Sequence, residues 1–367
     1  MQEKVYYLGW QIILPGLAKR IWSLIERFGT ARQAWLASEH DLVKIGGFSI
    51  ESALSLTQRK AQVDLEGEFE QLEKSNISYI FYNDPAYPEM LRGIFDPPPG
   101  LFVRGAMPVA DHLAVAIVGS RRPTPYGLAV AEKLASELAQ AGVVVVSGMA
   151  RGIDSSAHRG VLDAGGLTVA VLGCGVDVVY PRENRRLMEE IIAGGTVISE
   201  YPLGSTPEPW HFPVRNRIIS GISKAVVVVE AGERSGALIT ADCALEQGRD
   251  VLAVPGNISS PSSRGPNRLI KQGARLIEDA DDIFEEIGVG SLFKPGNGRI
   301  RSLPPITDEE KTFYQLLSHE PVHLDELIVR SGLSAQEALA ILMFLEIKGM
   351  VRQLPGKFYV LRQLTSG

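Results

Sequence analysis

The chain has 367 residues, 45% of them hydrophobic and 22% charged, and its formal net charge is −6. These totals predict a globular protein of two or three domains, one of which can bury a large core. They exclude a surface coated in basic residues, and the two cysteines, Cys174 and Cys243, are too few for a disulfide framework or a cysteine-based zinc site.

The first residues carry no targeting pattern. Met1–Lys4 lack the basic and then apolar design of a secretory signal, and no apolar run approaches the roughly 20 residues needed to cross a bilayer. We therefore expect a cytoplasmic protein with no membrane partner.

The N-terminal third predicts a helical domain followed by an arm. Residues 1–75 contain apolar residues at helical spacing, for example over 16–28, and indicate a small domain of the SAM or helix-hairpin-helix type. The glycine turn in 42–48 could bring backbone amides to a DNA phosphate or could simply join two helices, and the second interpretation is favoured. Residues 76–112 are rich in Pro and Tyr, which predicts an extended arm that leads into the core.

Residues 113–287 alternate apolar β-branched runs with helical segments. Runs such as Val143–Val146 and Val226–Val229 are typical of strands that are buried on both faces, as in a parallel sheet between helices. We predict an α/β fold with a Rossmann-like, mostly parallel sheet core. The expected strands are Leu113–Val118, Val143–Ser147, Thr168–Leu172, Thr196–Ser199, Ala225–Val229, Val251–Val254 and Ala274–Ile277.

The C-terminal part predicts a linker over 288–305 and a winged-helix domain over 306–367. Its expected helices and wing strands are Asp308–Leu317, Leu324–Arg330, Ser334–Lys348, Met350–Arg352 and Phe358–Leu361. The third helix, which would read DNA, has no basic residue before its last turn. That composition favours contact with a protein or a structural role over sequence-specific DNA binding.

The segment Ala116–Gly127 carries the clearest chemical signal in the chain. It predicts a buried strand, a turn of small residues and the start of a helix, where backbone amides and the helix dipole favour an anion. Arg121 and Arg122 add planar, permanently charged groups suited to phosphate.

Other loops are expected at the same edge of the sheet, because ligands of open α/β sheets bind beyond the carboxyl ends of the strands. These loops begin at Gly119, Ser147, Gly173, Glu200, Glu230 and Pro255. Arg182, Arg215 and Arg217 lie downstream, and residues 115–277 hold 17 Lys or Arg against 15 Asp or Glu. The sequence thus predicts a cleft with a glycine floor and arginine walls, compatible with a nucleic acid.

Common cofactor and catalytic patterns are missing from these loops. The first turn is not G-x-G-x-x-G, Ser147 ends the second strand in place of an acidic residue, and no Walker sequence is found, so no nucleotide cofactor is expected. The histidines show no metal spacing. Asp154, His158 and Glu200 do not suggest a triad, and we expect Asp154 to cap a helix and His158 to lie one turn further on, with no catalytic residue among them.

Aromatic residues accompany the arginines. Tyr126, Trp210 and Phe212 lie among the basic positions, and single-stranded nucleic acid combines stacked bases with phosphates that follow the charge. Each aromatic alone is more often a half-buried core residue, and their occurrence together shifts the balance toward binding.

The motifs of residues 113–280 resemble the DNA-processing protein A family, known as DprA or Smf, in order and over the whole core. The matching segments are Gly119–Arg121, Tyr126–Gly127, Ser147–His158, Leu172–Asp177, Tyr180–Asn184, Ser199–Tyr201, His211–Ile219, Arg234–Thr240, Gly248–Gly256 and Leu269–Ala274. The arm and both flanking domains also fit.

This resemblance implies a non-catalytic protein without cofactor or metal that binds single-stranded DNA, forms a homodimer through the core, and hands the DNA to the RecA recombinase in natural transformation. Arg121 would hold phosphate and Phe212 would pack against a base. The DNA-binding positions would be Gly119, Ser120, Arg121, Arg122, Gly148, Arg151, Arg182, Asn184, Phe212, Arg215, Asn216 and Arg217. Arg121→Ala or Arg217→Ala is then expected to weaken binding and flatten its salt dependence.

The chain departs from the family pattern at one position, and two alternative functions remain open. Some members of the family have a lysine just before the aromatic pair, where this chain has Pro209. The loop Gly232–Gly236 with Thr240 partly resembles enzymes that cleave nucleotide N-glycosidic bonds, which would need a carboxylate in the cleft; the candidates are Glu200, Glu230 and Glu233. A transcription factor that reads duplex DNA through 301–367 is the other alternative.

Overall fold

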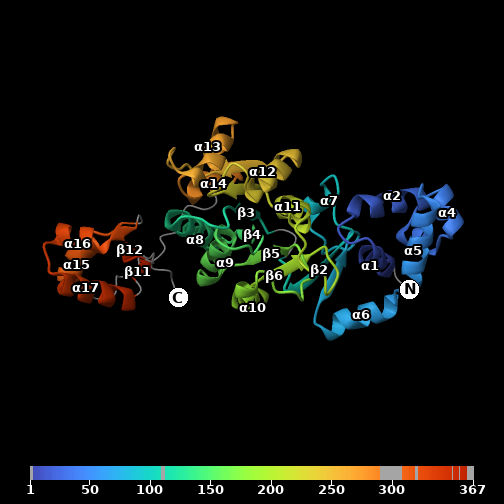
Figure 1. Ribbon diagram of the computed structural model, residues 1–367, viewed down its shortest axis with the longest axis horizontal. Helices are drawn as coiled ribbons and strands as arrows, with labels where there is room; N and C mark the ends of the chain where they lie inside the picture. Colours follow the sequence, from blue (N-terminus) through green and yellow to red (C-terminus); the bar gives the residue numbers. More distant parts are fainter. Residues whose placement is uncertain are drawn as a thin grey trace.

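The computed structural model describes residues 3–108, 112–289, 308–318, 321–348, 350–354 and 356–361. A helical N-terminal domain lies at one end, a large sheet flanked by helices in the middle, and a winged-helix domain at the other end (Figure 1). The predicted fold class is confirmed. Most of the predicted linker over 288–305 falls outside the described residues.

Six helices form the N-terminal domain. They are α1 (Lys4–Ile13), α2 (Ala18–Phe28), α3 (Ala31–Leu36), α4 (Glu39–Lys44), α5 (Ile50–Gln62) and α6 (Leu65–Lys74). Side-chain caps start four of them, for example Ser38, whose hydroxyl accepts from the amide of Asp41. The glycine turn joins α4 to α5. The Arg27 guanidinium packs against Gly47 in this turn and donates a hydrogen bond to the carbonyl of Ile45.

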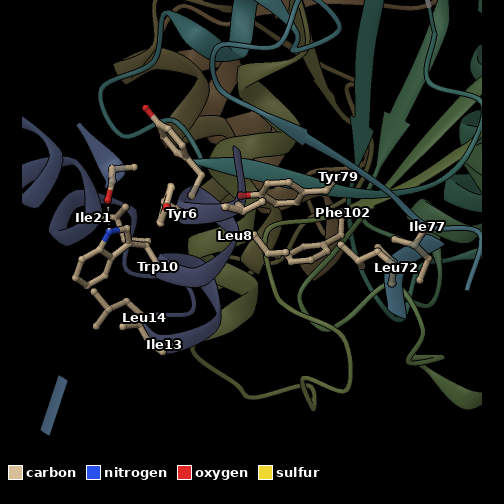
Figure 2. Packing of buried hydrophobic residues seen from close by; sticks show 14 of the residues in the cluster. Tyr6, Leu8, Trp10, Ile13, Leu14, Ile21, Leu72, Ile77, Tyr79 and Phe102 are labelled. Carbon is tan, nitrogen blue, oxygen red and sulfur yellow. Dashed lines mark hydrogen bonds between the residues drawn. The ribbon is translucent and has the colours of Figure 1, made fainter. Parts of the chain in front are cut away.

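The helical domain shares a hydrophobic core with the sheet. Leu8 of α1 lies beside Tyr79 and Phe102, which come from the first two strands (Figure 2). Gln11 adds polar contacts, because its Nε2 donates to the carbonyl oxygens of Gly100 and Glu200, each at 2.9 Å. The N-terminal domain is therefore packed firmly on the core.

The central sheet has nine strands in the order β1-β2-β6-β5-β4-β3-β7-β8-β9. The strands are β1 (Ser78–Phe81), β2 (Gly100–Gly105), β3 (Ala114–Val118), β4 (Val144–Ser147), β5 (Thr168–Leu172), β6 (Thr196–Ser199), β7 (Ala225–Val228), β8 (Asp250–Ala253) and β9 (Arg275–Leu276). Strands β3 to β9 pair in parallel, while β2 pairs antiparallel with β6 and β1 antiparallel with β2. The prediction of an extended arm over 76–112 is thus corrected, because this segment contains two strands that widen the sheet. The name arm is kept below for residues 82–99, which connect these two strands.

Helices cover both faces of the sheet, with α8, α9 and α14 on one face and α11, α12 and α13 on the other. The core helices are α7 (Glu89–Arg92), α8 (Pro125–Gln140), α9 (Ile153–Asp163), η1 (Arg182–Asn184), α10 (Arg185–Gly194), α11 (His211–Gly221), α12 (Gly236–Glu246), η2 (Pro261–Ser263), α13 (Arg264–Lys271) and α14 (Ala280–Glu286). The chain runs from β3 outward to β6 and then returns to β7 on the other side of β3. This reversal opens a crevice at the carboxyl ends of β3 and β7.

The C-terminal domain is a winged helix, as predicted. Its elements are α15 (Asp308–Tyr314), β10 (Val322–His323), α16 (Leu324–Ser331), α17 (Ala335–Ile347), β11 (Val351–Leu354) and β12 (Phe358–Leu361). Within the described ranges, no single helix is long and apolar enough to span a bilayer; α16 and α17 together pass by length and composition only, with a bend of 110° between them.

Candidate functional site

A cleft of about 780 Å³ lies at the point where the strand order reverses. Its walls come from the β3–α8 loop, the first turns of α11 and the β7–α12 loop. The residues that line it are Val118, Gly119, Ser120, Arg121, Arg122, Ala150, Asp154, Tyr180, Pro209, Phe212, Pro213, Arg215, Asn216, Ile219, Gly232, Arg234, Ser235, Gly236, Ala237, Ile239 and Thr240. A smaller pocket of about 30 Å³ adjoins it and includes Gly148 and Arg151.

The β3–α8 loop is held tightly against the rest of the core. A Cβ atom at Gly119 would lie 2.6 Å from Cγ1 of Ile153 and 2.9 Å from the carbonyl oxygen of Glu230, so the loop needs glycine there. The amide of Ser120 donates to that same carbonyl at 2.6 Å. Because these contacts fix the loop, Arg121 and Arg122, which are both exposed, are held in place as part of the cleft lining.

The buried carboxylate of Glu230 supports the start of α8. It accepts hydrogen bonds from the amide of Thr124 at 2.8 Å and from its hydroxyl at 2.6 Å. The Thr124 hydroxyl in turn caps α8 by accepting from the amide of Gly127. Glu230 thus acts as a structural anchor beneath the loop.

Arg121 and two aromatic rings form the most distinctive part of the cleft. The Arg121 guanidinium carbon lies 5.3 Å from the centroid of the Phe212 ring, which is within the range of a cation–π contact. The Tyr180 ring lies 5.4 Å from Phe212 at an interplanar angle of 33°. A cation beside two ring faces suits a ligand with both phosphates and planar bases.

Arg215 lies beneath this group and is mostly used by the protein itself. Its Nη1 donates to the carbonyl of Gly148 at 2.9 Å and also to the carbonyl of Val171. A Cβ atom at Gly148 would lie 2.5 Å from Nη1, so glycine makes room for the guanidinium. Burial lowers the pKa of Arg215 to about 10, against the opposing effect of Asp154, so the side chain remains a cation at neutral pH.

Asp154 does not cap α9 as predicted. The cap position is Gly152, with φ of +78°, and Asp154 lies inside the first turn, where its carboxylate accepts from the amide of Ala150 at 3.3 Å. Burial raises the pKa of Asp154, and the nearby Arg215 opposes this rise. Asp154 is the one acidic residue among the described residues that line the cleft.

His158 is fully buried and does not reach the cleft. Thr168 donates its only hydroxyl proton to the carbonyl of Val145 at 2.8 Å, so His158 must donate from Nδ1 to the Thr168 oxygen at 2.7 Å. The Nε2 atom is then an unprotonated acceptor without a partner in the described structure. Burial lowers the pKa of His158 to about 3, since a proton on Nε2 would be a buried, unpaired charge.

His158 is therefore expected to make folding less stable in acid. Below its ordinary pKa near 6.5, the unfolded chain binds a proton that the folded chain excludes until about pH 3. The free energy of unfolding should fall by about 1.4 kcal/mol per pH unit between roughly pH 6 and pH 4 from this residue alone. Denaturant titrations of the parent and of His158→Asn test this: the variant should lose stability less steeply, whereas His40→Asn, an exposed control, should follow the parent.

Three other predicted positions have different surroundings. Arg151 is exposed and forms an ion pair with Glu183 beside the smaller pocket. Asn184 is buried and donates from Nδ2 to the carbonyl of Met149 and to the hydroxyl of Ser155, each at 2.9 Å, which fixes the loop after β4. Arg182 is exposed at the start of η1 and lines neither pocket.

The prediction that Arg217 contacts phosphate has to be corrected. Arg217 is buried, its Nη2 lies 2.7 Å from Oε2 of Glu200, and its Nε lies 3.3 Å from Oδ2 of Asp96. Positions two apart on a helix point about 200° away from each other, so Arg217 faces away from the cleft that Arg215 lines. Arg217 ties α11 to the end of β6 and to the arm.

The carboxylates considered for N-glycosidic cleavage do not line the cleft. Glu200 is paired with Arg217, and Glu230 is bonded to Thr124. Glu233 is exposed and lies 3.3 Å from Arg264. Asp154, which does line the cleft, was not among these candidates and is buried beside Arg215.

Of the twelve predicted site residues, seven line the main cleft, namely Gly119, Ser120, Arg121, Arg122, Phe212, Arg215 and Asn216. Sequence reasoning missed Arg234 and Tyr180, which also line it. Arg234 could have been found, because the Gly232–Gly236 loop follows a strand next to β3 and leads into the N-terminus of α12. Asn216 donates to the carbonyl of Gly236 at 3.2 Å and so joins α11 to that terminus.

Two sequence families match the chain. Residues 78–288 match the family described as DNA recombination-mediator protein A, and residues 299–357 match the DprA winged helix domain. Protein Smf of Synechocystis is 35% identical over an alignment that covers 97% of this chain and 98% of its own length. DNA processing protein DprA of Bacillus subtilis is 45% identical over 58% of this chain and 72% of its own.

Solved structures agree with these matches. The X-ray structure of DNA processing protein A from Streptococcus pneumoniae has a TM-score of 0.67 and 36% identity, and covers 77% of this chain and 97% of that one. A structure that concerns the single-stranded DNA binding mode of DNA processing protein A from Helicobacter pylori has a TM-score of 0.52 and 32% identity over 57% of this chain and 94% of that one. The chain, as its motifs suggested, therefore belongs to the DNA recombination-mediator protein A family, also called DprA or Smf.

Proposed function

We propose that this chain binds single-stranded DNA without sequence preference in the cleft between β3 and β7, and that it acts as a recombination mediator. The observation that carries the proposal is the Arg121 guanidinium over the Phe212 ring, at the point where α/β sheets bind ligands. The Helicobacter pylori relative, whose structure concerns single-stranded DNA binding, adds support.

Each part of the cleft has a role in this proposal. Arg121, Arg122 and Arg234 neutralise phosphates, and the positive end of the α12 dipole at Gly236 adds to their effect. Phe212 offers a ring face to a base. Stacking and phosphate contacts do not distinguish base edges, so binding is expected to be independent of sequence.

The role of Phe212 is tested by Phe212→Leu, which keeps an apolar side chain but removes the ring. We expect about 10-fold weaker binding to an oligothymidylate and little change with an abasic strand of equal length, because only a base can stack. Filter binding with the full chain measures both, and Phe344→Leu on exposed α17 is the control. If the variant loses affinity equally for both strands, Phe212 does not contact a base.

Two partner roles belong to the proposal. We propose that the chain delivers bound DNA to the RecA recombinase, and that RecA filaments form faster on strands coated with single-strand binding protein when the chain is present. We also propose a homodimer through the core, because β9 is an open sheet edge with Leu276 exposed. RecA filament growth that is unchanged by the chain would contradict the delivery role. A monomer in light scattering would contradict the homodimer.

We propose a protein-binding or structural role for the winged-helix domain. The first basic residue along α17 is Lys348, which directly follows the helix. Its Nζ forms an ion pair with Glu310 at 2.6 Å. Leu339, Met343 and Phe344 of α17 are exposed and apolar. This surface is unlike the basic helices that read duplex DNA.

A further inference from the structure

A second group of aromatic and basic residues begins where the cleft ends. Trp210 occupies the cap position just before α11, directly after Pro209, which lines the cleft, and it is 49% exposed. The turn between α1 and α2 lies against it, because a Cβ atom at Gly16 would be 3.2 Å from Cζ3 of Trp210. The N-terminal domain therefore lies beside the start of α11, and Figure 1 shows α2 near α7.

Helix α2 continues this surface with cations over aromatic rings. Lys19 Nζ lies 4.8 Å from the centroid of the Phe95 ring, and the Arg20 guanidinium carbon lies 5.7 Å from that of Phe48. These pairs repeat the arrangement of Arg121 over Phe212 in the cleft. We call Trp210, Lys19, Arg20 and Phe95 the aromatic–basic surface.

The backbone around Phe95 is held firmly, although the residue itself is 88% exposed. Its neighbour Ile94 is buried in the core, and its other neighbour Asp96 is paired with Arg217 at 3.3 Å. Trp22 of α2 donates to the carbonyl of Pro97 at 2.7 Å, which fixes the arm to the helical domain. An exposed ring on such a support adds nothing to the core, and its backbone needs no further ordering when the ring binds a ligand.

The charge of this surface suits a polyanion. Neither Lys19 nor Arg20 forms an ion pair with any residue in the described ranges, whereas Asp96 is paired with Arg217. Glu89 of α7 is likewise paired, with Arg92. Lys19 and Arg20 are thus available to phosphates, while Asp96 and Glu89 are each paired with an arginine.

We propose that the aromatic–basic surface binds the nucleotides that leave the cleft, so that one strand of DNA runs from Arg121 and Phe212 across Trp210 to Lys19 and Phe95. Bases stack on the exposed rings, and Lys19 and Arg20 pair with phosphates. This inference rests on the proposed function and extends its binding site onto the N-terminal domain. A longer strand therefore gains contacts that a short one lacks.

The test compares oligothymidylates of about 6 and about 20 nucleotides, a span that brackets the site sizes of single-stranded DNA binding folds. With the full chain, Phe95→Ala should weaken binding of the longer strand about 10-fold and leave the shorter within twofold. Lys19→Ala should reduce the slope of log affinity against log salt by about 0.7 for the longer strand only. Phe344→Ala on α17 and Lys74→Ala on α6, both exposed, are the matched controls.

Tryptophan fluorescence gives a second readout. Trp10 and Trp35 are buried and Trp22 is half-buried, so Trp210 is the most exposed of the four tryptophans. We expect the longer strand to quench the fluorescence more than the shorter one, and Trp210→Phe to remove that difference.

Different results would overturn the aromatic–basic surface and the proposed DNA binding in the cleft. If Phe95→Ala and Lys19→Ala bind the longer strand as the parent does, while Arg121→Ala weakens the shorter one, the aromatic–basic surface is overturned and the cleft stands; a protein ligand for the surface would give this result. If Arg121→Ala leaves the shorter strand unaffected, the proposed function is overturned, and the inference with it.

Discussion

Replacement of Arg217 by methionine is expected to lower the free energy of unfolding by about 3–5 kcal/mol, because it leaves the buried Glu200 carboxylate without its partner. Arg217 also pairs with Asp96, so its loss weakens the attachment of the arm to α11. Burial would lower the pKa of Arg217, but Glu200 and Asp96 raise it, which keeps the side chain charged. Denaturant titration of the full chain, followed by circular dichroism, measures the change.

The double variant Glu200→Gln with Arg217→Met separates pairing from packing. Since it leaves no unpaired carboxylate at position 200, it should be less destabilised than Arg217→Met alone. Arg182→Met, at an exposed position, should change stability by less than about 0.5 kcal/mol. A stable Arg217→Met protein with a flatter salt dependence of DNA binding would instead place Arg217 at a phosphate.

The second large effect is expected at Arg121. Arg121→Ala should weaken binding of a short single strand about 10- to 100-fold, because it removes a charge-assisted phosphate contact and the cation over Phe212. The slope of log affinity against log salt should fall by about 0.7. Filter binding between about 50 and 200 mM salt measures both quantities, and the protein should unfold at the same denaturant concentration as the parent.

Two further variants interpret this result: Arg121→Lys separates charge from the planar shape of the guanidinium, and Arg186→Ala is the control. Lysine keeps the charge but not the planar fork, so the salt slope should be preserved while part of the affinity is lost. Arg186 is exposed on α10, where it pairs with Glu190 at 2.8 Å, and its removal should not affect binding. An Arg121→Ala protein with the parent's affinity and slope would exclude Arg121 from the DNA site.

The sequence alone was enough to predict the parallel sheet and the winged helix. Runs such as Val143–Val146 have only one favourable environment, a strand buried on both faces, and the loops that follow such strands must gather at one edge. This is why Arg121, Arg122 and Phe212 could be assigned to a common cleft. Sequence reasoning missed β1 and β2, because the prolines at 97–99 dominate that segment and hide the short strands on either side.

Only the tertiary structure decided how the charged residues of α11 and its neighbours are used. The segment Arg215–Arg217 reads as two equivalent cations, and helical geometry says only that they face opposite ways. The packing of α11 between the sheet, α12 and the arm sends Arg217 to Glu200 and Asp96, and Arg215 beneath the cleft. Local sequence determines which elements form, because periodicity and capping act over a few residues. Which side of an element meets a ligand depends on contacts between residues far apart in the chain.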